Sequence, residues 1–133
     1  MHIAPQSRTG WKGAENMAFV RKITDEPVRT DHMRGGEGYV LAKPILSGRE
    51  ELYDKGRLFN HIILEPGCEI GMHKHEGEGE TYYILKGKGR YYRGSETVEV
   101  GPGYVTFCGD GEEHGLFNDG PETLEMIALI LDC

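Results

Sequence analysis

Short runs in which apolar and polar residues alternate follow one another along most of the chain. They include GYVLAKPIL, RLFNHIILEPG and ETYYILKGKGRYYRG, each bounded by glycine, proline or aspartate. Successive side chains of a strand point to opposite faces, so this alternation predicts half-buried strands. The pattern predicts a first strand at 17–23, MAFVRKI, and four short strands within 97–131. Only EELYDKG, at 50–56, favours a helical turn or two.

Strand signals that recur every ~8–12 residues, with no long helix, predict an all-β antiparallel barrel or sandwich. The 133 residues suit one domain, since domains commonly run to roughly 100–150 residues. The 20 glycines lie between the apolar runs and mark turns. Residues 1–16 show no period, so we expect an N-terminal arm over 1–37 and a barrel domain over 38–133.

The net charge of −7, without a long basic cluster, argues against nucleic acid or an anionic membrane surface as a partner. Cys68, Cys108 and Cys133 are odd in number and widely spaced, which is unlike a disulfide framework and favours a reducing compartment. No apolar stretch approaches the ~18 residues of a membrane span. These features predict a cytoplasmic protein.

Two histidines in HKHEGEGE are placed for metal binding. His73 and His75 are two residues apart, so on a strand both imidazoles project from one face. His114 follows GDGEE further along, and carboxylates lie close to the first pair. Three imidazoles and one carboxylate suit Mn, Fe, Co, Ni or Zn. Taken alone, however, a surface His-x-His is more often a chance occurrence, and glutamate runs are usually solvated.

The spacing around these histidines resembles the first signature of the cupin superfamily, G-x5-H-x-H-x3–4-E-x6-G. In this register the carboxylate ligand is Glu80, because Glu76 and Glu78 stand too close to the second histidine. Every fixed position of the signature is present. These positions are Gly67, His73, His75, Glu80 and Gly87.

The second cupin signature, G-x5-P-x-G-x2-H-x3-N, is matched with one departure. Gly103, Gly111, His114 and Asn118 stand at their expected positions, while Gly109 replaces the usual proline. A glycine can make the same turn at a larger entropic cost. The resemblance therefore adds His114 as the fourth metal ligand, and we expect Asn118 to make structural hydrogen bonds.

This resemblance implies a double-stranded β-helix, or jelly-roll barrel, of the cupin type. One divalent transition metal per chain (Mn, Fe, Zn or Ni) would lie inside its mouth, held by His73, His75, Glu80 and His114. Cupins of this kind pair as homodimers through sheet faces or swapped N-terminal strands. The arm at 1–37 is the candidate for such a swapped strand.

Four other residues are candidates for catalysis, each with a plainer alternative. His61 could reach the cavity as a proton relay or hydrogen-bond partner of a ligand, although packing at a strand edge is at least as good an explanation. Tyr82 shares the face of Glu80 and could orient a substrate, or could be a core aromatic. Glu78 and Glu113 flank ligands and could act as acid or base, or be solvated loop residues.

The leading functional hypothesis is a small metal-dependent enzyme that acts on a small polar, oxygen-rich or carbohydrate-like molecule. Iron would favour a dioxygenase, whereas Mn, Zn or Ni would favour an isomerase, lyase or decarboxylase. The alternative is a metallocupin that binds or senses a small ligand without turnover. A third possibility is a metal-free shell, which the presence of all four ligand types disfavours. Fold alone does not choose among them.

Overall fold

A computed structural model describes residues 18–133, which form ten β-strands, one short α-helix and one 3-10 turn. None of the helices in this range has the length and apolar character needed to cross a membrane. The elements in chain order are β1 (Val28–Asp31), η2 (Met33–Gly35), β2 (Tyr39–Leu46), α1 (Gly48–Glu51), β3 (Gly56–Leu64), β4 (Glu69–Lys74), β5 (Glu78–Lys86), β6 (Gly89–Arg93), β7 (Glu96–Val100), β8 (Val105–Cys108), β9 (Glu113–Phe117) and β10 (Leu124–Asp132).

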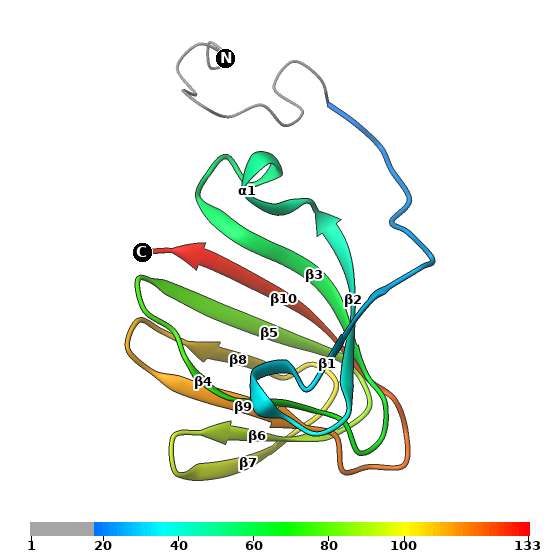
Figure 1. Cartoon of the computed structure of the whole chain (residues 1–133), viewed down its shortest axis with the longest axis vertical. Coiled ribbons are helices and arrows are strands. Elements are labelled where there is room, and N and C mark those ends of the chain that lie inside the picture. The colour runs from blue at the N-terminus through cyan, green and yellow to red at the C-terminus, as the bar shows by residue number, and fades with distance from the viewer. Residues whose placement is uncertain (1–17) are drawn as a thin grey trace.

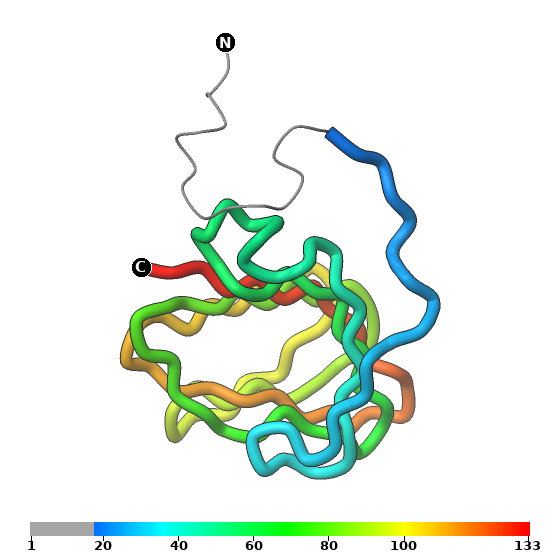
Figure 2. The backbone as a smooth tube through the Cα atoms, turned by 45° about the horizontal axis from the view of Figure 1, so that its top comes forward, coloured from blue at the N-terminus to red at the C-terminus, as the bar shows by residue number. Residues whose placement is uncertain are grey.

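The strands build two antiparallel sheets that face each other. The six-stranded sheet has the order β1-β2-β3-β10-β5-β8, and the four-stranded sheet has the order β4-β9-β6-β7 (Figure 1). Seen obliquely, the chain runs around a common interior (Figure 2). This arrangement is the expected all-β double-stranded β-helix of the jelly-roll type.

The strand predictions after residue 38 are confirmed, including the four strands of the C-terminal third. The short helix expected at 50–56 begins slightly earlier, at Gly48, and continues as a turn. The strand predicted at 17–23 is wrong for 18–23, which has no regular structure. An apolar run becomes a strand only where a neighbouring strand accepts its backbone hydrogen bonds, and here Phe19 and Val20 remain exposed.

The segment before β2 contributes to the barrel wall. Strand β1 pairs with β2 of the same chain, and η2 then lies against β4. Glycine makes this contact possible, because a Cβ on Gly71 would stand 2.1 Å from the Arg34 carbonyl oxygen. The close approach brings Met33 and Arg34 beside the interior of the barrel. Exchange of N-terminal strands between subunits stays a prediction.

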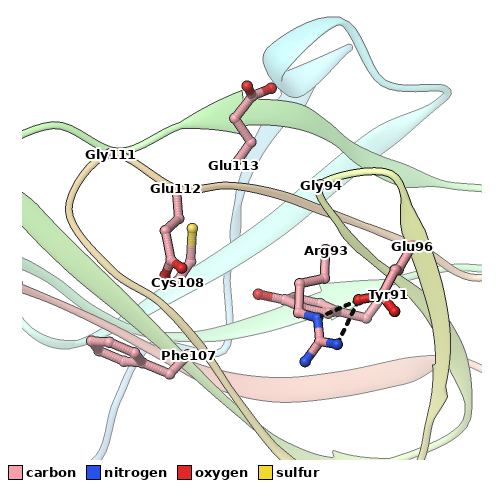
Figure 3. Close-up of a pocket in the computed structure, with 9 residues that line it drawn as sticks. All are labelled: Tyr91, Arg93, Gly94, Glu96, Phe107, Cys108, Gly111, Glu112 and Glu113. Atoms are coloured by element: carbon pink, nitrogen blue, oxygen red, sulfur yellow. Dashed lines mark hydrogen bonds and ion pairs between the residues drawn. The ribbon is translucent and has the colours of Figure 1, made fainter.

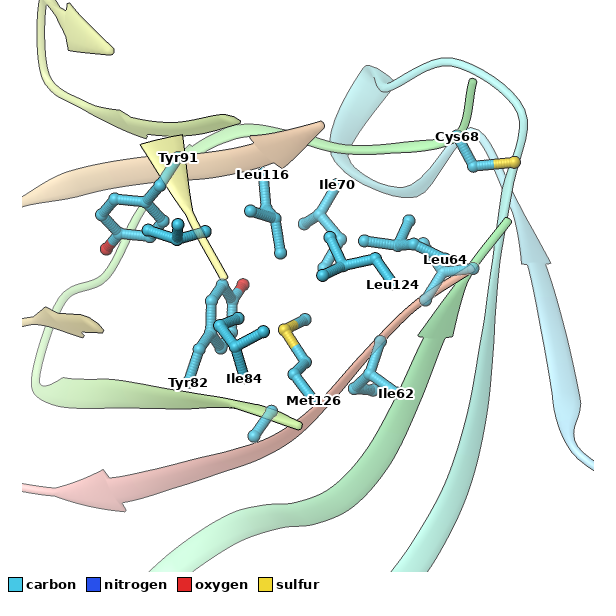
Figure 4. Packing of buried hydrophobic residues seen from close by; sticks show 13 residues of the cluster. Ile62, Leu64, Cys68, Ile70, Tyr82, Ile84, Tyr91, Leu116, Leu124 and Met126 are labelled. Atoms are coloured by element: carbon cyan, nitrogen blue, oxygen red, sulfur yellow. The ribbon is translucent and has the colours of Figure 1, made fainter. Parts of the chain in front are cut away.

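The hydrophobic core fills the space between the sheets (Figure 4). As the alternation predicted, Tyr82 and Ile84 of β5 and Leu116 of β9 point inward and are almost fully buried. Strand β10, the neighbour of β5 in the six-stranded sheet, contributes Leu124 and Met126 to the same core. The metal-ligand candidates lie at one end of this same layer, so the apolar core and the site share their strands.

Asn118 has the structural role that the sequence suggested. Its side chain is fully buried, and its Nδ2 donates to the carbonyl oxygens of Leu64 and Glu122, at 2.8 Å each. Its Oδ1 accepts the N–H of Gly120 at 3.0 Å. The amide therefore ties the end of β3 to the loop that leads into β10.

Gly87 lies in a turn where both the backbone conformation and the neighbouring chain disfavour a side chain. Its φ is +81°, and an added Cβ would lie 2.4 Å from the Thr123 carbonyl oxygen. Gly94 is a matched control, since its φ is also positive and a Cβ added there would have no atom within 4 Å. We expect Gly87→Ala to lower the free energy of unfolding by about 1–3 kcal/mol more than Gly94→Ala, because it adds overpacking to the shared backbone strain. Urea unfolding of both variants measures this difference, and equal losses would contradict it.

Candidate metal centre

Four side chains from three strands converge at one end of the barrel. His73 lies on β4, His75 directly follows that strand, and His114 on β9 pairs with His73 across the four-stranded sheet. Glu80 comes from β5 of the opposite sheet. One ligand atom from each residue lies within 4.8 Å of the other three. The structure thus brings together all four residues that the signatures singled out.

The distances show that the four donor atoms face a common point. The Nε2 atom of His73 lies 3.1 Å from the Nε2 atoms of both His75 and His114, which are 3.2 Å from each other. Oε1 of Glu80 lies 2.9 Å from His75 Nε2 and 3.0 Å from His114 Nε2. Its distance to His73 Nε2 is 3.7 Å.

The other ring nitrogens identify which tautomers are present. Nδ1 of His73 lies 2.7 Å from the Gly71 carbonyl oxygen, and Nδ1 of His75 lies 2.6 Å from a Glu78 carboxylate oxygen. Both partners only accept hydrogen bonds, so each Nδ1 carries the proton and each neutral ring has its lone pair on Nε2. Lone pairs that face one another at 3.1 Å need a cation between them. The donor set therefore fits a metal ion.

Burial strengthens this interpretation. Glu80 and His75 are 5% and 2% exposed, and His114 is fully buried. Burial raises the pKa of Glu80, but the contacts with the three imidazoles outweigh that effect and lower the pKa overall. Burial lowers the pKa of His114, whereas the contact with the Glu80 carboxylate raises the pKa of His75. An ionised carboxylate and a neutral imidazole are the forms that bind metals.

A cavity of about 160 Å³ opens beside these ligands inside the barrel. Three of the ligand candidates form one part of its wall, and Tyr82 lies next to them with its ring stacked on His114 at 4.9 Å. The other polar side chains of the wall are Arg34, Arg57 and Asn60. The remaining wall is apolar and comprises Met33, Ala42, Leu58, Ile62, Ile70, Ala128 and Ile130.

A larger groove of about 470 Å³ lies elsewhere, between the β6–β7 hairpin and the loop before β9 (Figure 3). Glu113, a catalytic candidate from the sequence, lines this groove together with Glu112. An ion pair between Arg93 and Glu96 occupies its other side (Figure 3). None of the four ligand candidates contributes to its wall. We therefore take the smaller cavity as the ligand site.

His61 does not reach the cavity. It lies on the outer face of the six-stranded sheet, where its Nε2 is 2.8 Å from Glu125 Oε1. The neighbouring Asn60 has the opposite orientation and lines the cavity. Alternation divides the residues of β3 between two faces, but which face is interior depends on the opposing sheet. The expectation that His61 acts at the site is thus corrected.

Sequence reasoning also missed Arg57 and Arg34. The pairing of β3 with β10 shifts register at Arg57. Leu58 faces Ile130 and Gly56 faces Leu131, so Arg57 has no paired residue on β10. Such a bulge redirects a side chain away from the face that alternation assigns to it. Arg34 belongs to η2, which the sequence placed in the arm. The one signal in the sequence for a polar cavity wall was Asn60, a polar residue on the otherwise apolar face of β3.

Glu78 contacts a ligand instead of the cavity. Its carboxylate accepts the His75 Nδ1–H and two hydrogen bonds from Arg57, from Nε and Nη2 at 2.8 Å each. The Arg57 bonds, together with the contact to His75, lower the pKa of Glu78 to about 2 despite partial burial. Glu78 is therefore an ionised partner of His75.

The turn before His114 explains how glycine replaces the usual proline. The Gly109 N–H donates to Glu112 Oε1 at 2.7 Å, and the Glu112 N–H donates back to the Gly109 carbonyl oxygen at 3.1 Å. A proline has no N–H and could not make the first bond. This chain therefore closes the loop with a side-chain bond that the common form of the signature lacks.

Comparison with known proteins shows that this chain is similar to members of one protein family. The sequence profile of the cupin domain matches residues 60–130. The oxalate-binding protein of Thermotoga maritima is 42% identical over 112 residues, which cover 84% of this chain and 92% of that protein.

Solved structures agree with this match. A crystal structure described as a predicted oxalate decarboxylase of Thermotoga maritima superposes with a TM-score of 0.79 at 42% identity, covering 81% of this chain and 93% of the other. A protein of Thermus thermophilus, 20% identical, superposes with a TM-score of 0.60 over 85% of this chain and 90% of its own. At that identity the second match supports the fold alone.

The cluster predicts the effect of removing one imidazole. We expect His75→Ala to reduce the bound divalent metal from near one ion per chain to a small fraction of that, because a buried ligand is lost. His61→Ala is the control, since it removes an imidazole on the outer face. Elemental analysis after loading and desalting measures both variants. Equal metal content in the two would rule out the assignment of His75 as a ligand.

Proposed function

This chain belongs to the cupin family, and from that premise we propose that it binds one divalent transition metal and, with it, a small dicarboxylate, oxalate being the first candidate. The metal ligands would be His73, His75, Glu80 and His114. The observation that carries the proposal is the small cavity that ends on three of these ligands and has arginine and asparagine in its wall.

The donor set supports the metal half of the proposal. Two of the imidazoles present Nε2 lone pairs to the same point as an ionised carboxylate. Imidazole and carboxylate ligands suit Mn, Fe, Zn and Ni alike. A bound divalent metal would supply Lewis acidity toward the oxygens of a chelating ligand.

The cavity volume limits the size of the ligand. About 160 Å³ is available, whereas pockets for drug-sized ligands measure roughly 300–1,000 Å³. A two-carbon dicarboxylate is small enough for this space. The volume therefore favours the small, oxygen-rich ligand over the carbohydrate-like one among the sequence-based expectations.

The polar groups of the wall favour an anion. Arg57 and Arg34 contribute two cationic side chains and Asn60 an amide. Guanidinium groups bind carboxylates through paired N–H donors, which adds directional preference to charge attraction. The rest of the wall is apolar, so a bound carboxylate would interact with these few groups and the metal in a low-dielectric environment.

The names of the related proteins support the same ligand. The Thermotoga relative is called an oxalate-binding protein, and the superposed structure is described as a predicted oxalate decarboxylase. Both names agree on oxalate and differ on turnover.

The lining of the cavity favours binding over turnover. Apart from the ligand candidates, the part of the wall in residues 18–133 contains no carboxylate and no imidazole. Tyr82 is the remaining group able to transfer a proton, and burial raises its pKa well above the ordinary value. General acid–base catalysis needs a group with a pKa near the working pH. We therefore favour a binding metallocupin over the dioxygenase, isomerase, lyase and decarboxylase chemistries.

Oxalate binding should depend on the metal. We expect titration calorimetry to show that metal-loaded protein binds oxalate at least ~10-fold more tightly than EDTA-treated protein, because the metal would coordinate the oxalate oxygens and about 1.4 kcal/mol already corresponds to tenfold in affinity. Malonate and succinate should bind more weakly, since the small volume of the cavity favours the smallest dicarboxylate.

His75→Ala serves as the control for metal-dependent binding in that titration. Equal affinity with and without metal, or no binding of any dicarboxylate, would contradict the proposal. Release of formate and carbon dioxide from oxalate in equal amounts would instead establish a decarboxylase.

A further inference from the structure

Glu78 is hydrogen-bonded on both sides. Oε2 accepts from His75 Nδ1 at 2.6 Å and from Arg57 Nη2 at 2.8 Å, while Oε1 accepts from Arg57 Nε at 2.8 Å. The Glu78 side chain is only 14% exposed. A single carboxylate thus joins a candidate metal ligand to a cation.

Arg57 connects this pair to the ligand cavity. Its side chain lines the cavity together with His73, His75 and Glu80. A guanidinium has five N–H donors, and the two bonds to Glu78 leave three of them without a partner among the described residues. The bidentate contact holds the planar group in one orientation with donors to spare for an anion.

The partners of the other two imidazoles lack such a link. His73 Nδ1 donates to the backbone carbonyl of Gly71, and His114 Nδ1 lies 2.8 Å from the Tyr91 hydroxyl. Neither partner lines the small cavity or contacts Arg57. Only the Nδ1 partner of His75 is shared with a cavity-lining cation.

We propose that Glu78 is a positioning residue for both halves of the site: it orients His75 toward the metal and Arg57 toward a carboxylate of the bound anion. This inference rests on the proposed function, because it takes a small dicarboxylate as the anion. Partners that orient a ligand histidine raise metal affinity, and a cation held in its bound orientation loses less conformational entropy when the anion arrives.

Three variants separate these roles. Glu78→Gln keeps the shape of the side chain and removes its charge. Arg57→Gln removes the cation and leaves the Glu78 carboxylate beside His75. Tyr91→Phe is the matched control, since it removes the hydrogen-bond partner of a different ligand histidine, His114. Zn²⁺ affinity is measured by competition with a chelating dye, and oxalate affinity by calorimetry on the Zn²⁺-saturated protein.

The three variants should give different patterns. Glu78→Gln should weaken Zn²⁺ binding ~10–100-fold and oxalate binding at least ~10-fold through the unanchored Arg57. Arg57→Gln should weaken oxalate binding similarly, with a smaller loss of Zn²⁺ affinity than Glu78→Gln, because the Glu78 carboxylate remains to accept the His75 Nδ1–H. Tyr91→Phe should weaken Zn²⁺ binding and leave the oxalate affinity of the loaded protein within about threefold.

Two results would overturn the shared role of Glu78. One is unchanged Zn²⁺ affinity in Glu78→Gln, and the other is wild-type oxalate affinity in that variant once it is loaded. Thermal unfolding shows whether Glu78→Gln is folded. If it is not, equal losses of oxalate affinity in Arg57→Gln and Tyr91→Phe would also overturn the shared role of Glu78. If wild-type protein binds Zn²⁺ but no oxalate, the proposed function itself fails. The wild-type measurement therefore distinguishes that failure from a failure of the role given to Glu78.

Discussion

The convergence of three imidazoles and one carboxylate inside the barrel is the constraint on which the rest of the site depends. Their donor atoms lie about as close together as hydrogen-bonded atoms do, and three of the four residues are nearly inaccessible to water. Buried polar groups are costly unless each has a partner. The outer bonds to Gly71, Glu78 and Tyr91 supply partners on one side of each ring. A cation is the complement that the inner side requires.

The barrel architecture meets this constraint by joining two sheets. The imidazoles belong to strands of the four-stranded sheet or the residue beside it, whereas Glu80 comes from the six-stranded sheet. The site therefore exists only when the two sheets are packed face to face. Leu116 and Tyr82 continue the same inward-facing rows into the core, so the packing that stabilises the fold also determines the separation of the ligands.

Selectivity toward a ligand arises from elements around this centre. The apolar wall of the cavity comes from β2, β3, β4, β10 and η2, and its cations come from η2 and the beginning of β3. The turn η2 can lie this close only because glycine at position 71 leaves room for the Arg34 carbonyl. The backbone contact between η2 and β4 thus helps to set the volume and the charge of the space beside the metal-ligand candidates.

Local alternation in the sequence predicted the strands after residue 38, and the resemblance of two motifs to the cupin signatures implied the jelly-roll class and the four ligand candidates. Both signals are local, since they place side chains on one face of a short segment. The sequence could not decide whether His61 or Asn60 faces inward, since alternation defines two faces and only the opposing sheet makes one of them interior. Nor could it place Arg57, whose side chain is redirected where the register of β3 and β10 shifts. Those positions depend on pairing between distant strands, which only the tertiary structure decides.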